Sequence, residues 1–169
     1  MQHDGIGASA VRGALAGTIG TLVFDAFLFR RYRAGGGRSS ALAWESSAGI
    51  DSWDSAPAPA RVAKRLLEAA TGREVPARYA RPLNNVMHWG FGVANGAAYG
   101  LVAQQRKLPQ WSGLVFGAAV WASGYVVLPE LGVYEPIWKY DLETLEQDLT
   151  GHLVYGTATA TAYAVLRER

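Results

Sequence analysis

The sequence predicts an all-α fold: a bundle of four transmembrane helices built from two similar, parallel hairpins, within one domain of residues 1–169. Three long stretches of the sequence contain no formally charged residue: 24 residues at 82–105, 22 at 108–129 and 18 at 149–166. A water-exposed helix needs a polar face, whereas a helix that crosses the hydrocarbon layer needs about 20 mostly apolar residues. These stretches therefore favour a small polytopic membrane protein.

The overall composition excludes several classes of protein. There is no cysteine, which excludes a disulfide scaffold and cysteine-ligated zinc sites. The 16 Lys and Arg residues against 14 Asp and Glu residues give a net charge of +2, which does not indicate a nucleic-acid partner. Hydrophobic residues make up 50% of the chain, so the uneven distribution of charge carries more information than the average.

Four segments are predicted to span the membrane, at about residues 13–29, 86–104, 111–128 and 149–166. The first is short and contains Asp25. We expect it to be retained, because the first eleven residues lack Lys and Arg and contain Asp4, unlike a signal peptide. All four are rich in Gly, Ala, Ser and Thr, which favours close helix contact. The alternative is a soluble Ala/Gly-rich bundle, but that would need polar positions at regular spacing on its outer face.

The long first connection, residues 30–85, is predicted to contain an amphipathic helix at about residues 57–71, opened by Pro57 and Pro59 and closed by Gly72. It either lies in the headgroup layer or packs as a solvated helix on the rest of the loop. The cations predicted to contact lipid headgroups, including anionic ones, are Arg30, Arg31, Arg61, Lys64, Arg65, Arg78 and Arg81.

The third connection is acidic and should emerge on the same side as the first. Leu142, Leu145 and Leu149 recur at helical spacing, which predicts a second amphipathic helix leading into the fourth span. The cations on the opposite side are Arg12, Arg106, Lys107, Arg167 and Arg169. The number of cations places the large loops in the cytoplasm, whereas their density in short segments favours the reverse orientation.

An internal repeat is suggested when His88 is aligned with His152, an offset of 64. This alignment pairs His, Gly, Ala, Ala and Tyr, and Gly13 and Gly17 similarly match Gly113 and Gly117. Such a pattern is typical of two parallel hairpins related by an axis along the membrane normal. The small residues predicted to pack the helices together are Gly13, Gly17, Gly92, Gly96, Gly100, Gly113, Gly117, Gly156 and Ala160.

A polar cluster is predicted at one level of the bundle. Its members are Asp25, His88, His152, Tyr125 and Glu130. Ionisable groups inside a membrane are costly, so they are usually paired or functional. One interpretation is a hydrogen-bond network that stabilises the bundle, and another is proton, ion or small-solute handling by histidine. Ligation of haem by two histidines and a membrane-embedded enzyme using a histidine base are weaker alternatives.

The segment ARPLNNVMHWGFGVANGAAYG and the Asp148-Leu149-x-x-His152 approach to the fourth span resemble the YagU-like family of small bacterial inner-membrane proteins. The resemblance implies a four-span fold in a bacterial plasma membrane. It implies no catalytic residues.

The expected function is a structural or stress-related membrane component without catalysis, multi-pass in the plasma (inner) membrane. The alternative is a proton-coupled ion or solute-handling protein. We expect the lipid bilayer as the partner, with no nucleic acid, no metal and no cofactor, and a homo-oligomer is compatible with the sequence. No motif of a known catalytic site or metal site is present.

Overall fold

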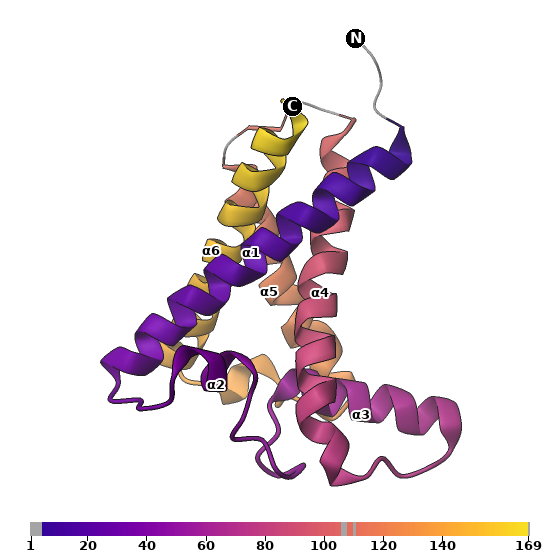
Figure 1. Cartoon of the computed structure of the whole chain (residues 1–169), viewed down its shortest axis with the longest axis vertical. Helices are drawn as coiled ribbons and strands as arrows, with labels where there is room; N and C mark the ends of the chain where they lie inside the picture. The colour runs from indigo at the N-terminus through magenta and orange to yellow at the C-terminus, as the bar shows by residue number, and fades with distance from the viewer. Residues whose placement is uncertain (1–4, 106–107, 110, 169) are drawn as a thin grey trace. The chain divides into compact units, whose positions relative to one another are not determined.

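The computed structural model describes residues 5–105, 108–109 and 111–168, and this part of the chain is built from helices and turns without a strand (Figure 1). The all-α prediction is therefore confirmed for the described residues. The long helices are α1 (Ile6–Ala34), α4 (Ala80–Ala103), α5 (Ser112–Glu130) and α6 (Leu142–Arg167). The short helices are α2 (Ala41–Glu45), α3 (Ala58–Thr71), η1 (Ala77–Tyr79) and η2 (Ile137–Lys139).

The chain divides into two compact units. Unit 1 contains the described residues of 1–28, 91–123 and 141–169, and unit 2 contains residues 29–90 and 124–140. Unit 1 therefore holds most of α1, the C-terminal half of α4, most of α5 and all of α6. Unit 2 holds the remaining ends of α1, α4 and α5 together with the first and third connections.

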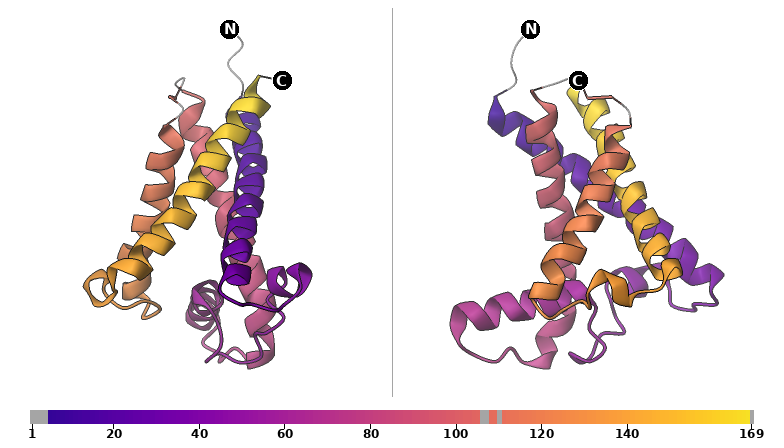
Figure 2. Two further views of the ribbon diagram at one scale, coloured as in Figure 1. Left: turned by 90° about the vertical axis from the view of Figure 1, so that its left-hand side faces the viewer. Right: turned by 180° about the vertical axis from the view of Figure 1, so that it is seen from behind.

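The four helices of unit 1 alternate in direction (Figure 2). Gly13 of α1 lies against Gly96 and Gly100, whereas Gly17 lies against Gly92 and Gly96, so α1 and α4 are antiparallel. The hydroxyl of Tyr155 reaches Gly92 and that of Tyr163 reaches Gly100, so α6 runs parallel to α4. The direction of each helix agrees with an up-and-down bundle.

Small and aromatic side chains fill the interior of unit 1, and large aliphatic side chains cover its outside. The buried cluster consists of Ala16, Tyr99, Ala103, Ala160 and Tyr163. By contrast, Val11 and Leu15 of α1 are 61% and 52% exposed, and Val115 of α5 is 56% exposed. In a water-soluble bundle the aliphatic residues would form the core. The polarity of this unit is therefore the reverse of the usual one.

Two helices are long and apolar enough to cross a membrane: α1, with 29 residues, and α5, with 19, each with a mean hydropathy of 1.4 over its best segment. Only 33% and 22% of those segments are buried within the protein. A core helix of a soluble protein would be mostly buried. The other two predicted spans, 86–104 and 149–166, lie within α4 and α6, which carry polar residues in their first turns.

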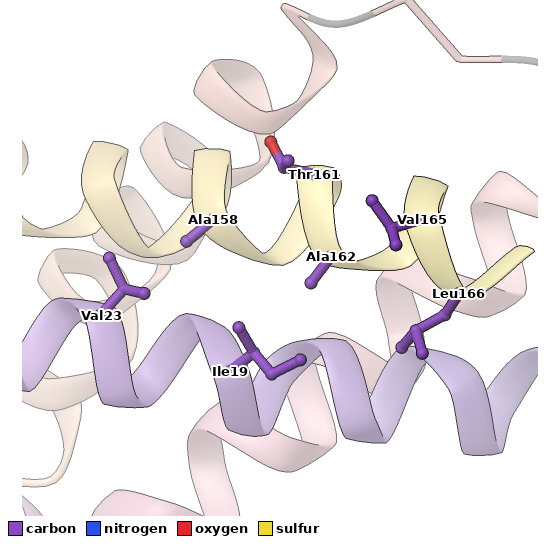
Figure 3. Close-up of a pocket in the computed structure, with 7 residues that line it drawn as sticks. All are labelled: Ile19, Val23, Ala158, Thr161, Ala162, Val165 and Leu166. Carbon is purple, nitrogen blue, oxygen red and sulfur yellow. The ribbon is translucent and has the colours of Figure 1, made fainter.

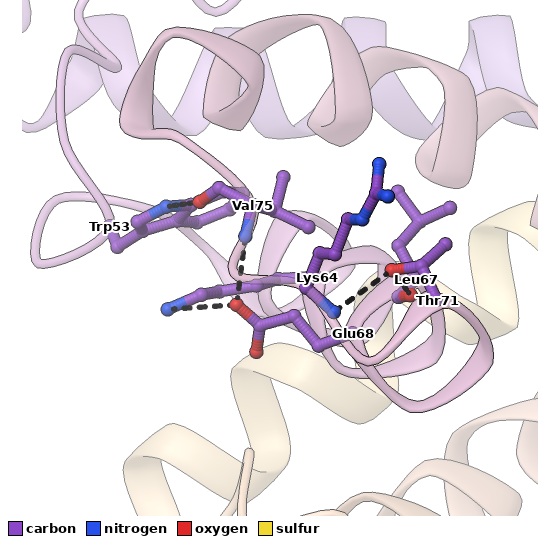
Figure 4. Close-up of polar contacts among 7 residues, drawn as sticks. Trp53, Lys64, Leu67, Glu68, Thr71 and Val75 are labelled. Atoms are coloured by element: carbon purple, nitrogen blue, oxygen red, sulfur yellow. Dashed lines mark hydrogen bonds and ion pairs between the residues drawn. The ribbon is translucent and has the colours of Figure 1, made fainter.

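Unit 2 is held together differently. Its small core contains Ala56, Ala60 and Ala80, packed with Ile50 and Trp53. Helix α3 starts after Pro57 and ends at Gly72, which has the left-handed conformation (φ +64°) that favours glycine. The sequence predicts this helix at about residues 57–71. The indole N–H of Trp53 donates to the Val75 carbonyl at 2.8 Å, and the Val75 N–H donates to Glu68 at 3.1 Å (Figure 4).

The third connection does not form a separate amphipathic helix. The residues from Leu142 onward continue without interruption into α6, which begins at the N-cap Asp141. The physical reason is local: no proline or glycine separates the leucine-containing turn from the rest of α6 before Gly151, and the Asp141 carboxylate accepts the Thr144 N–H at 2.7 Å.

Candidate functional site

The first helix contact of unit 1 joins α1 and α4 through their backbones. A Cβ atom on Gly17 would lie 2.5 Å from the carbonyl oxygen of Gly92 and 2.8 Å from the Cα of Gly96. A Cβ on Gly13 would lie 3.0 Å from the Cα of Gly100. Real Cβ atoms do not approach backbone atoms closer than about 3 Å without a shift, so these positions accept only glycine.

The second contact joins α5 and α6 in the same way. A Cβ on Gly113 would lie 2.8 Å from the Gly156 carbonyl oxygen and 2.9 Å from the Cβ of Ala160. A Cβ on Gly156 would in turn lie 2.5 Å from the backbone nitrogen of Gly117. Gly117 also meets the carbonyl group of His152. All nine predicted packing residues therefore lie at close contacts between helices, eight of them as glycines and Ala160 through its Cβ.

The two contacts correspond position by position. Gly96 meets Gly13 and Gly17, and Gly156 meets Gly113 and Gly117 through the same backbone atoms. The first helices of the two hairpins thus match at an offset of 100 and the second helices at an offset of 60. The sequence identities at His and Tyr instead correspond at an offset of 64, which is one helical turn further along. In the packing register, His152 corresponds to Gly92 rather than to His88.

Tyrosine side chains of α6 bond to the backbone of α4, which the sequence did not indicate. The Tyr155 hydroxyl donates to the Gly92 carbonyl at 2.6 Å, and the Tyr163 hydroxyl donates to the Gly100 carbonyl at 3.1 Å. Both acceptors are glycines, whose missing side chains leave the carbonyl groups accessible. The available signal is the spacing: Tyr155 and Tyr163 are eight residues apart, as are Gly92 and Gly100.

The residues predicted to form the polar cluster are divided between the two units. Asp25 and His152 belong to unit 1, whereas His88, Tyr125 and Glu130 belong to unit 2. Their assembly at one level therefore stays a prediction. Asp25 is only 5% exposed, although it lies in an apolar helix. A carboxylate at such a position is costly unless it is paired.

His152 has a defined environment within unit 1. Its Nδ1 atom lies 2.8 Å from the backbone carbonyl oxygen of Asp148 and 3.5 Å from the Asp148 carboxylate. In the neutral imidazole, a proton on Nδ1 donates to that carbonyl and leaves Nε2 as an acceptor. Phe24 of α1 packs edge-on against the imidazole, with the ring centroids 5.6 Å apart. His152 therefore lies beside the α1 segment that carries Asp25.

In unit 2, the ring of Tyr125 belongs to an aromatic cluster. Its ring lies 5.4 Å from the rings of both Tyr134 and Tyr140. Glu130, the last residue of α5, is exposed. The cluster of three tyrosines connects the end of α5 to the third connection, so it stabilises the local structure of this unit.

Some predicted headgroup ligands have structural contacts in unit 2. Lys64 pairs with Glu68 at 3.7 Å and lies 5.1 Å from the centre of the Trp53 ring. Arg81 donates from Nε to the Ser46 carbonyl at 2.9 Å. Arg78 lies over the Tyr79 ring at 5.0 Å. The exposed members of the predicted set are Arg30, Arg61, Arg65, Arg78 and Arg81.

The Arg81 hydrogen bond is one of several hydrogen bonds between the start of α4 and residues Ser46 and Ser47, which the sequence did not predict. The amide groups of Asn84 and Asn85 donate to the Ser47 hydroxyl at 2.9 Å and to the Ser46 carbonyl at 3.1 Å. Ser47 has a positive φ of 54°. Three side chains of the first α4 turns thus hold one turn of the long connection. These hydrogen bonds give Arg81, Asn84 and Asn85 a structural role, and the headgroup contact of Arg81 stays a prediction.

Among the described residues, no group of three or more His, Asp or Glu side chains could hold a metal ion. The two histidines proposed as haem ligands, His88 and His152, lie in different units, so haem ligation stays a prediction. Three of the cations predicted to lie on the side opposite the large loops, Arg106, Lys107 and Arg169, lie outside the described residues.

Comparison with known proteins places most of this site within one family. No curated protein and no solved structure matches the chain. A family model described as "Protein of unknown function (DUF1440)" matches residues 77–161, which is 85 of the 169 residues. The match includes α4, α5 and most of α6. It therefore covers the contact glycines of these three helices but not Gly13 and Gly17 of α1. The YagU-like resemblance is consistent with it but is not established by it. Because the match covers half of the chain, the protein belongs to this family.

Proposed function

We propose that this protein is a four-span integral membrane protein of the bacterial plasma membrane with a structural role. The observation that carries the proposal is the reversed polarity of unit 1, with Gly, Ala and Tyr inside and Val, Leu and Ile outside. Contiguous apolar surface on this scale is unfavourable in water but matches lipid hydrocarbon.

The contacts of α4 and α6 support their placement in the same layer as α1 and α5. Residues 92–100 of α4 touch the backbone of α1 at Gly13 and Gly17, within the apolar part of α1. Residues 152–160 of α6 touch α5 at Gly113 and Gly117. If α1 and α5 cross the membrane, these parts of α4 and α6 must cross beside them.

The same contacts favour a structural role over solute passage. Backbone atoms of α1 and α4 touch, as do those of α5 and α6, so no water-filled path can run between the two helices of either hairpin. Tyr155 and Tyr163 then bond α6 to α4. An interior held by such contacts suits a rigid element within the membrane.

Membrane extraction and cysteine labelling together test this proposal. The chain should stay in the pellet after alkaline extraction of membranes and should be released by detergent. Because the chain has no cysteine, single-cysteine variants can report topology directly. With an impermeant maleimide, Ser55→Cys and Glu135→Cys should label from one side, and Gln105→Cys and Glu168→Cys from the other.

The alternatives give different labelling patterns. If only α1 and α5 cross, Ser55→Cys and Gln105→Cys will label from the same side, and Glu135→Cys and Glu168→Cys from the other. A chain that remains in the supernatant of lysed cells without detergent contradicts membrane insertion altogether. The positions chosen for labelling are exposed and lie outside the helix contacts, so the substitutions should not disturb the packing of the helices.

A second candidate function is proton-coupled ion or solute handling. The observation that favours it is the position of His152, bonded to Asp148 and packed on Phe24, next in sequence to the buried Asp25. Histidine changes charge in the physiological pH range. Liposomes under a pH gradient would compare the natural protein with His88→Ala and His152→Ala. Loss of flux in variants that keep their thermal stability supports this candidate, and absence of flux in the natural protein contradicts it.

A further inference from the structure

A groove lies between α1 and α6 in unit 1 (Figure 3). Its lining residues are Ile19, Val23, Ala158, Thr161, Ala162, Val165 and Leu166. Alanines on α6 face aliphatic side chains on α1, so the seam between the helices is hollow instead of filled. The groove has a volume of about 550 Å³, within the range of about 300 to 1,000 Å³ that is typical of small-molecule sites.

The lining of the groove restricts its ligand to a hydrocarbon. Six of the seven lining residues are aliphatic. The hydroxyl of Thr161 donates to the Thr157 carbonyl of its own helix at 2.9 Å, so it is already bonded. A polar ligand would lose its hydrogen bonds to water without replacing them. An acyl chain loses nothing in such a groove and gains close contacts.

One end of the groove carries positive charge. Arg167 follows the lining residue Leu166, and its guanidinium donates to the Ala103 carbonyl at 3.1 Å, which uses one of five N–H groups. Arg12 precedes Ile19 by seven residues, or two helical turns, and lies on the same face of α1.

The directions of the helices bring both arginines to this end. Gly20 lies against Thr159, and Phe24 lies against Gly151, so α1 and α6 are antiparallel. The residues before Ile19 in α1 and those after Ala162 in α6 therefore lie at the same end of the groove. A guanidinium pair at the mouth of a hydrocarbon groove matches a phosphate attached to an acyl chain.

We propose that this groove binds one anionic phospholipid, with an acyl chain between α1 and α6 and the phosphate at Arg12 and Arg167. The site lies at the end of unit 1 where α1 begins and α6 ends, and it is separate from the loop cations predicted to contact headgroups. The proposal rests on the membrane placement proposed above. The charge at the mouth of the groove favours a lipid over a second copy of the chain, whose apolar face would not need two arginines.

Native mass spectrometry of the full chain, purified in mild detergent, tests the site. The probes are phosphatidylglycerol and phosphatidylcholine with identical acyl chains. The natural protein should retain one phosphatidylglycerol per chain in the presence of equal phosphatidylcholine. Arg12→Gln and Arg167→Gln should each lower that preference about fivefold. Arg73→Gln, which changes an exposed arginine of unit 2, is the matched control and should leave the preference unchanged.

The groove itself is tested by Ala162→Leu, which should fill it and abolish retention of either lipid. Ala164→Leu, on an exposed face of the same helix, should retain the lipid. If Ala162→Leu does not fold by circular dichroism, the smaller Ala158→Val replaces it. Equal retention of both lipids by the natural protein overturns the proposal, as does lipid retention in a folded groove variant. A change in the dimer fraction instead of lipid binding would also overturn it, by assigning the groove to a second copy. A chain that binds lipid nowhere but still pellets with membranes contradicts this site and not the membrane proposal.

Discussion

The α1/α4 and α5/α6 hairpins use the same backbone contacts but differ in the side chains around them. In the first hairpin, α4 presents glycine at positions 92, 96 and 100. In the second, α6 presents His152, Gly156 and Ala160 at the corresponding positions. Only the central glycine is common to both. The backbone contact at the centre therefore demands glycine, and the flanking positions are decided by their neighbours.

The flanking pair Gly92 and His152 shows how the neighbours decide. All three atoms nearest to a Cβ on Gly92 belong to the side chain of Thr21. His152 meets Gly117 only through its backbone and packs its imidazole against Phe24 of α1. A large side chain is therefore accepted where a third helix offers it a surface, and excluded where a side chain of the partner helix already fills the space.

The largest effect is expected at the central glycines. Gly96→Ala and Gly156→Ala place a Cβ against backbone atoms that no side-chain movement can relieve. Each should destabilise the protein by about 1 to 3 kcal/mol or more, and by similar amounts if the hairpins pack alike. Thermal unfolding in detergent, followed by circular dichroism, measures both.

Gly90→Ala is the control for this comparison, because nothing lies within 4 Å of a Cβ at that position of α4. It should be neutral or stabilising by up to about 1 kcal/mol, since alanine is the better helix former. Destabilisation by only one of Gly96→Ala and Gly156→Ala would show that the two contacts are not equivalent. Equal destabilisation by Gly90→Ala would show that the loss of stability does not come from these contacts.

A smaller loss of stability is expected for Gly92→Ala, and a second substitution should restore part of it. Gly92→Ala clashes with the hydroxyl of Thr21, so Thr21→Ala should recover part of the loss. The coupling free energy should be about 0.5 to 3 kcal/mol in a double-mutant cycle measured by thermal unfolding. The same Thr21→Ala change should not rescue Gly96→Ala. Additive effects at Gly92 and Thr21 would mean that the backbone, and not the side chain, excludes the alanine.

The sequence predicts the faces of these helices but not their register. Residues at offsets of 60 and 64 differ by four positions, about one helical turn, and so lie on the same face. Identities at His and Tyr favour 64, whereas the backbone contacts of Gly96 and Gly156 correspond at 60. Side-chain identity cannot show where two backbones touch. The packing glycines were therefore predictable from the sequence, and their pairing was not.

The tyrosine bonds between the hairpins should contribute less than the glycine contacts. Tyr155→Phe removes a hydroxyl that donates to the Gly92 carbonyl at 2.6 Å, and Tyr163→Phe removes one at 3.1 Å from the Gly100 carbonyl. Each loss should cost about 0.6 to 1.5 kcal/mol, with Tyr155 the larger. Thermal unfolding measures the difference, with Tyr79→Phe, a half-exposed ring outside these contacts, as the control. Identical stability of all three variants would contradict a role for these bonds.

The hydrogen bonds of these tyrosines and of the Ser46–Ser47 turn could not be predicted from the sequence. A tyrosine in an apolar stretch is typical of a membrane interface, so its hydroxyl gives no sign of a distant carbonyl acceptor. Arg81, Asn84 and Asn85 suggest a headgroup ligand and helix caps, but they bond to a turn 35 to 39 residues away. Contacts at such separation depend on how the connection folds back, which local patterns do not specify.

The smallest effect concerns how the second helix of each hairpin begins. Helix α6 starts at Asp141, whose carboxylate accepts the Thr144 N–H at 2.7 Å, whereas α4 follows directly from the turn η1. That hydrogen bond holds the pKa of Asp141 below its ordinary value. A carboxyl group whose pKa is lower in the folded state adds stability above its unfolded pKa, and this contribution is lost as the pH falls through the folded pKa, below about 4. Asp141→Asn keeps a cap but should remove this part of the pH dependence, while Asp141→Ala should lower stability at pH 7 as well. If the unfolding curves of Asp141→Asn and the natural protein shift equally between pH 7 and pH 3, the charge of the Asp141 carboxylate does not contribute to stability, whereas the comparison with Asp141→Ala at pH 7 still measures the cap itself.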